Sequence, residues 1–369
     1  MGDRVLIAPN AFKGTLKAME VAHIIAGVIQ KVRPNTSIEL CPIADGGDGT
    51  CELLTELLDL KKINIETFDP LGRPIMGFYG FEKETATAFV DVSTVSGVGL
   101  LKSNEIDAQV TSTFGTGKLI VHAIQQGAQT IVLGLGGSAT VDLGLGILQA
   151  LGVTFLNEKG RAIIPFSPDV LGKVRHIQLN KPLPKIKFFC LCDVDNTFFG
   201  QKGAIPVFGP QKGINSDDFA KLEAKAMNMI SLLSLKTKKV VQDQKGFGAA
   251  GGIAFGLSFF FDTALEKGAP FYFGQIKITE KVAKADFIIT GEGRYDSQSN
   301  SGKGAYELKK IMDAKDKVGA LISSGREGSS AGFQTYIQLP DLDFRRPDFK
   351  SLAAQNLKQV VKDFLEKSS

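Results

Sequence analysis

The sequence has few of the residues that build disulfides, histidine-bound metal sites or catalytic triads. Its 369 residues include four cysteines and three histidines. The cysteines lie in apolar runs typical of strands and helices, so we expect buried free thiols rather than a disulfide or a metal site. Three histidines give little support to Ser-His-Asp chemistry. The cysteines are Cys41, Cys51, Cys190 and Cys192, and the histidines are His23, His122 and His176.

Long basic runs and long apolar runs are also missing. The formal net charge of +4 is spread along the chain, which disfavours a nucleic-acid partner but leaves a field that favours an anionic substrate. Two uncharged stretches, 119–141 and 246–261, are too rich in polar residues or glycine, or too short, to span a membrane. A strand follows directly after residue 4, which leaves no room for a signal peptide. We therefore expect a cytoplasmic protein without a membrane partner; the oligomeric state stays open.

Glycine is abundant, which indicates many tight loops. The chain has 41 glycines. The loop 134–142 follows an apolar strand-like run and precedes a helix-like run, where α/β proteins bind phosphate. Glycines such as Gly136 and Gly137 let the backbone approach an anion closely, and Ser138 and Thr140 add hydroxyl donors. We therefore expect an anion-binding or phosphate-binding loop.

The same loop allows two other interpretations. Residues 134–139 also fit the dinucleotide pattern G-x-G-x-x-A, with Glu158 where a ribose ligand could lie, as in a NAD-dependent dehydrogenase of a small hydroxy acid. A plain tight turn is the other interpretation of the loop. For the function of the whole protein, an anion-binding regulator without catalysis is a further alternative. Asp142 and the hydroxyls of Ser138 and Thr140 fit an anion-binding site with charge chemistry better than they fit these alternatives. Neither 117–118 nor 302–303 completes a Walker A motif.

Carboxylates follow three further apolar strand-like runs. Asp45 lies in the glycine-rich loop 44–50, Glu292 in the loop 291–296, and Asp193 directly after the continuous apolar run 186–192. Parallel sheets place their ligands at such strand ends. Helix-start stabilisation, an ordinary turn and a solvated ion pair are the structural alternatives. Together these loops favour a phosphoryl-transfer or metal-assisted site.

Strands and helices alternate simply at both chain ends, and the pattern changes in the middle. The chain is long enough for two domains. We expect a two-domain α/β fold: residues 1–70 plus 285–369 form a Rossmann-like parallel-sheet domain, and 71–284 form an inserted mixed α/β domain, with the active site in the cleft between them. Expected strands are 4–8, 38–41, 75–81, 86–92, 130–133, 153–156, 186–192, 286–290, 317–323 and 335–339; expected helices are 16–32, 50–60 with Thr50 as N-cap, 116–126, 142–151, 215–236, 250–266, 303–312 and 350–366.

Seven short strings are distributed along the chain: IAPNAFKGTL (7–16), ADGGDGT (44–50), GGSAT (136–140), CDV (192–194), VFGPQKG (207–213), GAAGG (248–252) and TGEGR (290–294). In order and spacing they resemble the type 1 glycerate kinases over essentially the whole chain. The resemblance implies ATP-dependent phosphorylation of glycerate, usually to 2-phosphoglycerate. It also implies a Rossmann-like domain from both chain ends with an inserted α/β domain.

Phosphoryl transfer requires cations around the phosphates, carboxylates for Mg²⁺ and an acceptor for the alcohol proton. Lys13, Lys212 and Arg294 are the expected cations, and Arg294 is best suited to hold the glycerate carboxylate. We expect Asp193 to orient or deprotonate the substrate hydroxyl, with Asp45 as the second choice. The remaining expected site residues are Ser138 for substrate, Asp45, Asp193 and Glu292 for Mg²⁺, and Gly46, Gly47, Gly136, Gly137, Thr140, Gly291 and Gly293 for phosphate or nucleotide.

The chain departs from the family pattern at three places. The family more often has Asp-Ser where this chain has Asn10 and Ala11, and Asn-Asp-Gly at 141–143, where this chain has Val-Asp-Leu. The lysine of its common His-Gly-Lys string is kept at Lys303, but the neighbours differ. These changes bear on the preferred hydroxy acid and leave the reaction class unchanged.

Overall fold

The computed structural model describes residues 3–295 and 304–367, and the chain divides into two compact units. The first unit contains the residues up to Asp45 and those from Ala269 onward. The second unit is the continuous segment Gly46–Gly268. The change of pattern near residue 70 is a turn inside the second unit, because the strands on either side of it pair with each other.

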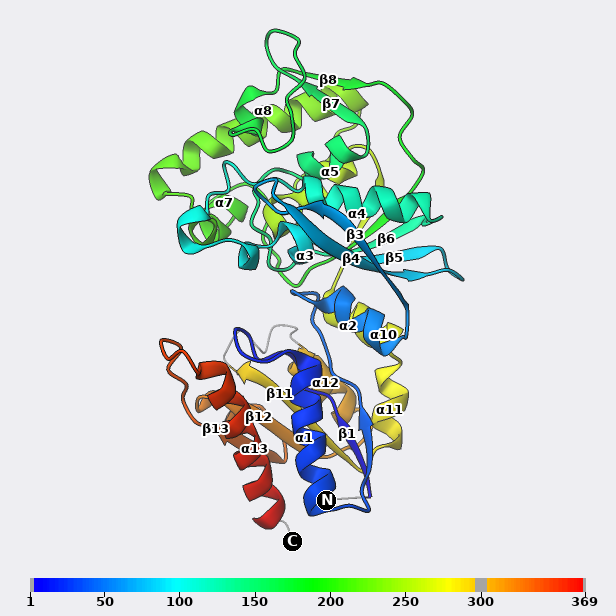
Figure 1. The fold of residues 1–369 in the computed structure, drawn as a ribbon, viewed down its shortest axis with the longest axis vertical. Helices are drawn as coiled ribbons and strands as arrows, with labels where there is room; N and C mark the ends of the chain where they lie inside the picture. Colours follow the sequence, from blue (N-terminus) through cyan, green and yellow to red (C-terminus); the bar gives the residue numbers. More distant parts are fainter. Residues whose placement is uncertain (1–2, 296–303, 368–369) are drawn as a thin grey trace. The chain divides into compact units, whose positions relative to one another are not determined.

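The first unit is built on a five-stranded sheet in which every strand pair is parallel. The strand order is β13-β12-β11-β1-β2 (Figure 1). From β1 the next strand, β2, is added on one side, whereas β12 and β13 are added on the opposite side of β11. The order of the strands therefore reverses between β1 and β11, which form the topological switch point. The bounds are β1 Arg4–Ile7, β2 Ser37–Leu40, β11 Phe287–Arg294, β12 Gly319–Ser324 and β13 Thr335–Leu339.

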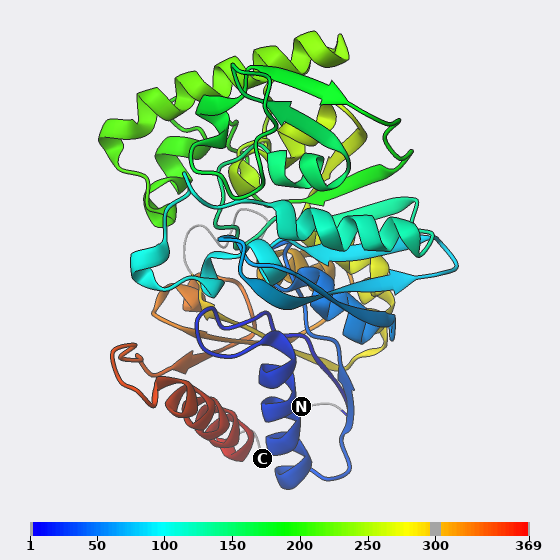
Figure 2. The ribbon, with the colours of Figure 1, turned by 45° about the horizontal axis from the view of Figure 1, so that its top comes forward.

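Helices cover both faces of this sheet. The helices α1 (Ala18–Val32) and α13 (Phe349–Lys367) lie side by side (Figures 1 and 2). Val21, Ile25 and Ile29 of α1 are fully buried, because residues four apart share one face of a helix. The other helices of this unit are α10 Gly268–Gln275, which begins at the last residue of the second unit, α11 Ile278–Lys284 and α12 Gly304–Asp313.

The second unit contains a six-stranded mixed sheet of order β10-β9-β6-β5-β4-β3. Its first four strands are parallel, and β4 and β3 add an antiparallel meander. A separate pair, β7 and β8, is antiparallel. The bounds are β3 Lys61–Phe68, β4 Pro74–Glu82, β5 Thr87–Asp91, β6 Thr130–Gly134, β7 Val153–Leu156, β8 His176–Leu179, β9 Lys187–Leu191 and β10 Asp262–Glu266.

Helices α2 and α4 cover opposite faces of the six-stranded sheet. A side chain at Gly80 would meet Thr55 of α2, whereas one at Gly77, on the other face of β4, would meet Leu119 of α4. The α-helices of this unit are α2 Thr50–Leu57, α3 Ser93–Ser96, α4 Phe114–Gln125, α5 Leu145–Ala150, α6 Val170–Lys173, α7 Ala204–Phe208, α8 Phe219–Thr237 and α9 Ile253–Ser258.

Several sequence expectations are confirmed and others are wrong. The fold class, the hairpin of β4 and β5 and the four buried free cysteines are as expected. The helix expected over 250–266 is wrong, because α9 ends at Ser258 and β10 follows. Thr50 is not the N-cap of α2: Gly49 is, in a left-handed conformation, and the Thr50 hydroxyl donates to the Gly47 carbonyl.

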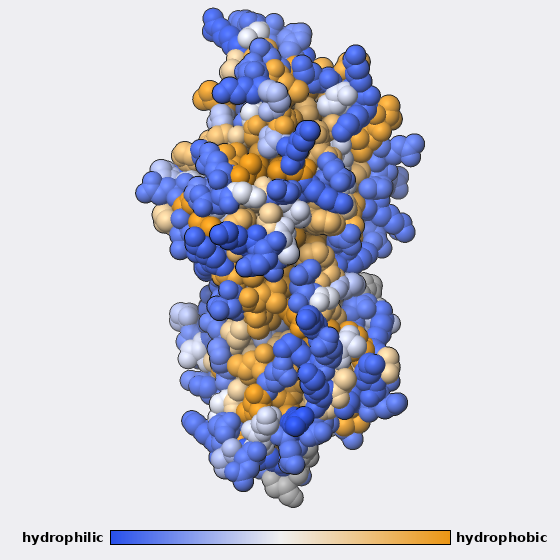
Figure 3. Space-filling model, turned by 90° about the vertical axis from the view of Figure 1, so that its right-hand side faces the viewer, coloured by the Kyte–Doolittle hydropathy of each residue, from blue (hydrophilic) through white to orange (hydrophobic). Residues whose placement is uncertain are grey.

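No helix among the described residues is both long and apolar enough to cross a membrane. On the face that Figure 3 shows, polar side chains are interspersed with apolar ones in each unit. Single exposed apolar side chains are ordinary on such a surface.

Candidate active site

A pocket of about 500 Å³ lies in the first unit, at the carboxyl ends of β1, β11, β12 and β13. Asn10, Lys13 and Thr15 come from the loop after β1 and Ser324 from the last position of β12. The segment 339–344 comes from the end of β13 and the loop after it. This edge of an open parallel sheet, next to the switch point, is where such folds bind ligands.

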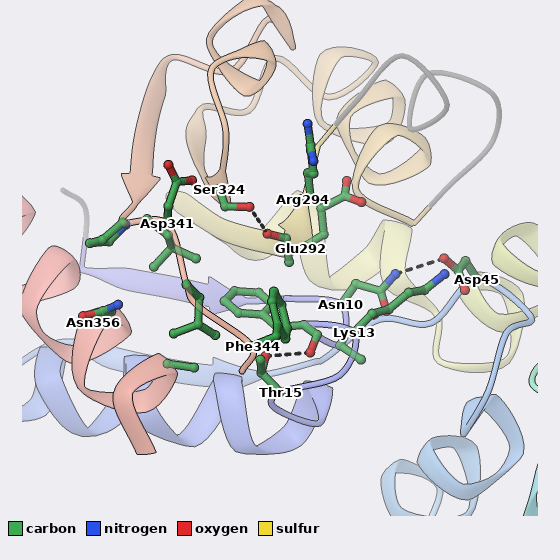
Figure 4. Close-up of a pocket in the computed structure, with 17 residues that line it drawn as sticks. Asn10, Lys13, Thr15, Asp45, Glu292, Arg294, Ser324, Asp341, Phe344 and Asn356 are labelled. Atoms are coloured by element: carbon green, nitrogen blue, oxygen red, sulfur yellow. Dashed lines mark hydrogen bonds between the residues drawn. The ribbon is translucent and has the colours of Figure 1, made fainter. Parts of the chain in front are cut away.

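Two carboxylates and two cations that the sequence predicted meet in this pocket (Figure 4). Asp45 and Glu292 are only 9% and 6% exposed, so they lie in the wall. Lys13 and Arg294 are exposed. The Asn10 amide donates to the Asp45 carboxylate over 3.1 Å, which orients it. The pocket therefore combines fixed carboxylates with cations that remain accessible to an anion.

The segment 291–294 is not the loop expected from the sequence. It continues β11, and the pairing with β12 shifts between Gly291 and Arg294, as in a β-bulge. A Cβ at Gly293 would lie 3.3 Å from the backbone of Phe12 and Lys13, and one at Gly291 would lie 2.7 Å from the Ile322 carbonyl. Gly293 therefore lets β11 pass close to the loop after β1, and Gly291 lets it pack closely against β12. Asp296 and Lys303 lie outside the described residues.

In the second unit, the two glycine-rich loops contact each other. A Cβ at Gly136 would lie 2.6 Å from the Gly47 Cα and closer still to the Asp48 amide nitrogen. Gly137 has φ of +69° and faces the Asp48 side chain. The absence of side chains at these positions therefore brings the backbones of the loops 46–49 and 134–140 together.

Lys212 lies beneath the second of these loops. It is 3% exposed, and its ammonium group donates to the Ser138 hydroxyl and the Thr140 carbonyl, each at 2.8 Å. Burial lowers the pKa of Lys212 to about 7, although the nearby Asp142 charge acts in the opposite direction. The Thr140 hydroxyl is buried and has no hydrogen-bond partner among the described residues. Three residues that the sequence proposed separately, Lys212, Ser138 and Thr140, thus lie together.

Asp142 has a structural role rather than the chemical role suggested by its loop. Its carboxylate accepts hydrogen bonds from the Thr113 amide and hydroxyl and from the amides of Gly144 and Gly146. Burial raises the pKa of Asp142, and these donors offset part of that effect. The residue anchors the start of α5 to the start of α4.

Asp193 occupies the strand-end position expected from the sequence, two residues beyond β9. Its Oδ1 accepts a hydrogen bond of 3.0 Å from the Gly268 amide, and its Oδ2 would lie 3.4 Å from a Cβ at Gly46. Gly46 has φ of +86°, and a Cβ there would lie closer still to the Gly268 backbone, at 2.7 Å from its Cα. Asp193 is thus oriented beside the first residue of the loop 46–49.

A buried carboxylate that the sequence did not single out, Asp91, supports that loop. It accepts hydrogen bonds from the amides of Cys51 and Glu52 at the start of α2. Burial raises the pKa of Asp91 to about 7, with the nearby Asp48 charge acting in the same direction. Asp91 therefore connects the end of β5 to the helix that follows the loop 46–49.

The structure gives no support to dinucleotide binding at Gly134. That fingerprint requires a helix directly after the glycines and the acidic residue at the end of a neighbouring parallel strand. Here α5 begins only at Leu145, and Glu158 follows β7, which lies outside the six-stranded sheet. Glu158 is also exposed.

The described residues contain no group of three or more His, Cys, Asp or Glu side chains that could hold a metal ion. Other pocket residues escaped the sequence analysis, although several follow strands and obey the same strand-end rule. They are Ser324, Asp341, Leu342, Phe344 and Asn356.

A family model described as the glycerate kinase family matches residues 5–367 of the chain. The chain belongs to the glycerate kinase family. This membership agrees with the resemblance seen in the sequence, and its relatives from Bacillus subtilis and Escherichia coli are named as kinases, which are phosphotransferases.

Named relatives share about a third of their residues with the chain. Glycerate kinase of Haemophilus influenzae is 35% identical over 97% of this chain and 98% of its own. Glycerate kinase of Bacillus subtilis is 34% identical over 90% and 87%, and glycerate 2-kinase of Escherichia coli is 33% identical over 81% and 79%. A crystal structure of a Salmonella typhimurium protein assigned as glycerate kinase 2 matches with a TM-score of 0.83 at 30% identity, covering 100% of this chain and 98% of that one.

Proposed function

We propose that this protein transfers the γ-phosphoryl group of ATP to the 2-hydroxyl of D-glycerate, giving 2-phosphoglycerate and ADP. The observation that carries the proposal is a single pocket lined by the cations Lys13 and Arg294 and by the buried carboxylates Asp45 and Glu292, in a chain of the glycerate kinase family. We further propose that residues of both units serve this one reaction.

The cations have distinct roles in this proposal. Lys13 is exposed beside the pocket and would neutralise phosphate charge. The planar guanidinium of Arg294 can hold the glycerate carboxylate with two parallel hydrogen bonds. Lys212 already binds Ser138 and the Thr140 carbonyl, so its charge would stabilise an anion at the loop 134–140.

Asp45 and Glu292 would hold a Mg²⁺ ion, since both are carboxylates held in the wall of one pocket. Bound Mg²⁺ would neutralise charge on the phosphates. Asp193 is proposed to accept the proton of the substrate hydroxyl or to orient it, because the Gly268 amide fixes its carboxylate. Asp45 is the second candidate for this role, and Asp193 is the third candidate for Mg²⁺.

The choice of the 2-hydroxyl has two supports. The Escherichia coli relative is named glycerate 2-kinase. Phosphorylation beside the carboxylate brings two anions close together, and three cations among the proposed residues would reduce that repulsion.

The test incubates the protein with D-glycerate and ATP-Mg²⁺ and follows ADP. We expect a phosphorus resonance coupled to one carbon-bound proton, and a product that enolase consumes without phosphoglycerate mutase. A product that requires the mutase would contradict the position but not the kinase activity. Failure to form ADP with either enantiomer of glycerate would contradict both. NAD(H) in place of ATP serves as the control and should leave the melting temperature unchanged, whereas ATP-Mg²⁺ should raise it.

A further inference from the structure

We propose that the pocket of the first unit binds the nucleoside of ATP, with the base against Phe344 and the triphosphate toward Lys13. This inference rests on the proposed function, because it assigns a place to the phosphoryl donor. It concerns the part of the pocket formed by β13, the loop after it and α13, to which the sequence analysis gave no role.

The size of the pocket favours a nucleotide over glycerate. A volume of about 500 Å³ is typical of sites that enclose a ligand of nucleotide or drug size. A three-carbon acid would leave most of that volume to water, and it has little apolar surface to bury. Much of the apolar lining comes from the segment after β12, as Leu339, Pro340, Leu342, Phe344 and Ala353.

The chemistry changes along the pocket in the same order as it changes along ATP. Figure 4 shows Asp45, Asn10 and Lys13 toward one end, and Asp341 and Asn356 toward the other. The first end offers charge for phosphates. The other offers a carboxylate that can accept hydrogen bonds from ribose hydroxyls and an amide that can pair with the donor and acceptor on an adenine edge.

Phe344 supplies the surface on which a base could stack. Its side chain is 60% exposed although it lines the pocket. The ring is supported by Phe349 at a centroid distance of 5.8 Å, and it lies 3.7 Å from where a Cβ of Gly14 would be. A supported ring with an open face is the arrangement on which bases stack. The edge of the sheet is also the expected one, because folds with this strand order bind nucleotides beside the switch point.

The test compares a ligand that has a nucleoside with one that lacks it. Binding of ATP-Mg²⁺ and of inorganic tripolyphosphate with Mg²⁺ is measured by calorimetry for the wild type and for Phe344→Ala. We expect the variant to bind ATP about tenfold more weakly and tripolyphosphate as tightly as the wild type. Val318→Ala is the matched control, because Val318 is 44% exposed in the same unit but precedes β12, at the opposite edge of the sheet.

Photolabelling locates the base independently. 8-Azido-ATP should label the segment 339–356, and excess ATP should prevent the labelling. Labelling confined to other segments, or unchanged ATP affinity in Phe344→Ala, would overturn the nucleoside assignment. Equal loss of affinity for both ligands would also overturn it, since that result indicates a disturbed fold or phosphate site.

The two proposals fail separately in these experiments. If ADP forms from ATP and D-glycerate while Phe344→Ala leaves the KM for ATP unchanged, the nucleoside assignment is wrong and the kinase stands. If ATP binds and labels the segment 339–356 but no phosphoglycerate forms, the nucleoside assignment stands and the proposed reaction is wrong.

Discussion

Replacing Gly136 by alanine tests whether contact between the two glycine-rich loops positions the reacting groups. The added Cβ would lie 2.6 Å from the Gly47 Cα, whereas ordinary contacts begin near 3.4 Å. The loop 46–49 must therefore move by about 1 Å, because the atoms in the way belong to the backbone. The φ angle of Gly136 is outside the left-handed region, so alanine adds no backbone strain of its own.

A displacement of about 1 Å at a site that positions reactants can reduce the rate about 100-fold. The same crowding should lower the free energy of unfolding by about 1 to 3 kcal/mol, which leaves most of the protein folded at 25 °C. The assay measures kcat/KM for D-glycerate at saturating ATP-Mg²⁺, together with the thermal melting curve. The matched control is Gly99→Ala, because no atom lies within 4 Å of a Cβ at Gly99. Wild-type kcat/KM in Gly136→Ala would refute the positioning role of this contact.

Three further substitutions separate chemistry from structure. Asp193→Asn should lower kcat about 100-fold with an unchanged melting temperature, and near-wild-type turnover would remove Asp193 from the chemistry. Lys212→Met should abolish proton uptake on anion binding. The pKa of Lys212 is about 7, so a bound anion favours the charged form of this lysine above that pH. Calorimetry above pH 7, in buffers of different ionisation enthalpy, should therefore detect proton uptake in the wild type only. Asp142→Ala should cost about 3 kcal/mol or more of unfolding free energy because it leaves buried donors without their acceptor, and an unchanged denaturant midpoint would contradict the anchoring role.

The sequence was most informative about the ends of strands, because parallel sheets place their ligands at the carboxyl ends of strands and this rule can be applied to local sequence. Continuous apolar runs ending in a polar residue indicated the carboxyl ends of parallel strands, and Asp193 lies at such an end. The same rule led to Asp45 and Glu292, which line one pocket. Asn10 was noted only as a departure from the family pattern, yet its amide holds Asp45, because the pairing depends on residues 35 positions apart.

Features that depend on tertiary contacts could not be read from local patterns. Burial of Lys212 follows from the packing of its loop against residues more than 70 positions away. Asp142 looked available for chemistry because its donors at Thr113 lie 29 positions earlier in the chain. The segment 262–266 looked helical from its composition but joins the sheet, because β9 offers it a parallel partner along its full length.

The pairing of β1 with β11 has a consequence for biosynthesis. Val5 pairs with Phe287, so the central strand of the first sheet lacks one neighbour until about 280 more residues have been made. At translation speeds of about 5 to 20 residues per second, that interval lasts roughly 15 to 60 s. The second unit is continuous in sequence and can complete its own sheet within this time. Residues 4–45 are therefore made before the second unit and reach their final pairing after it.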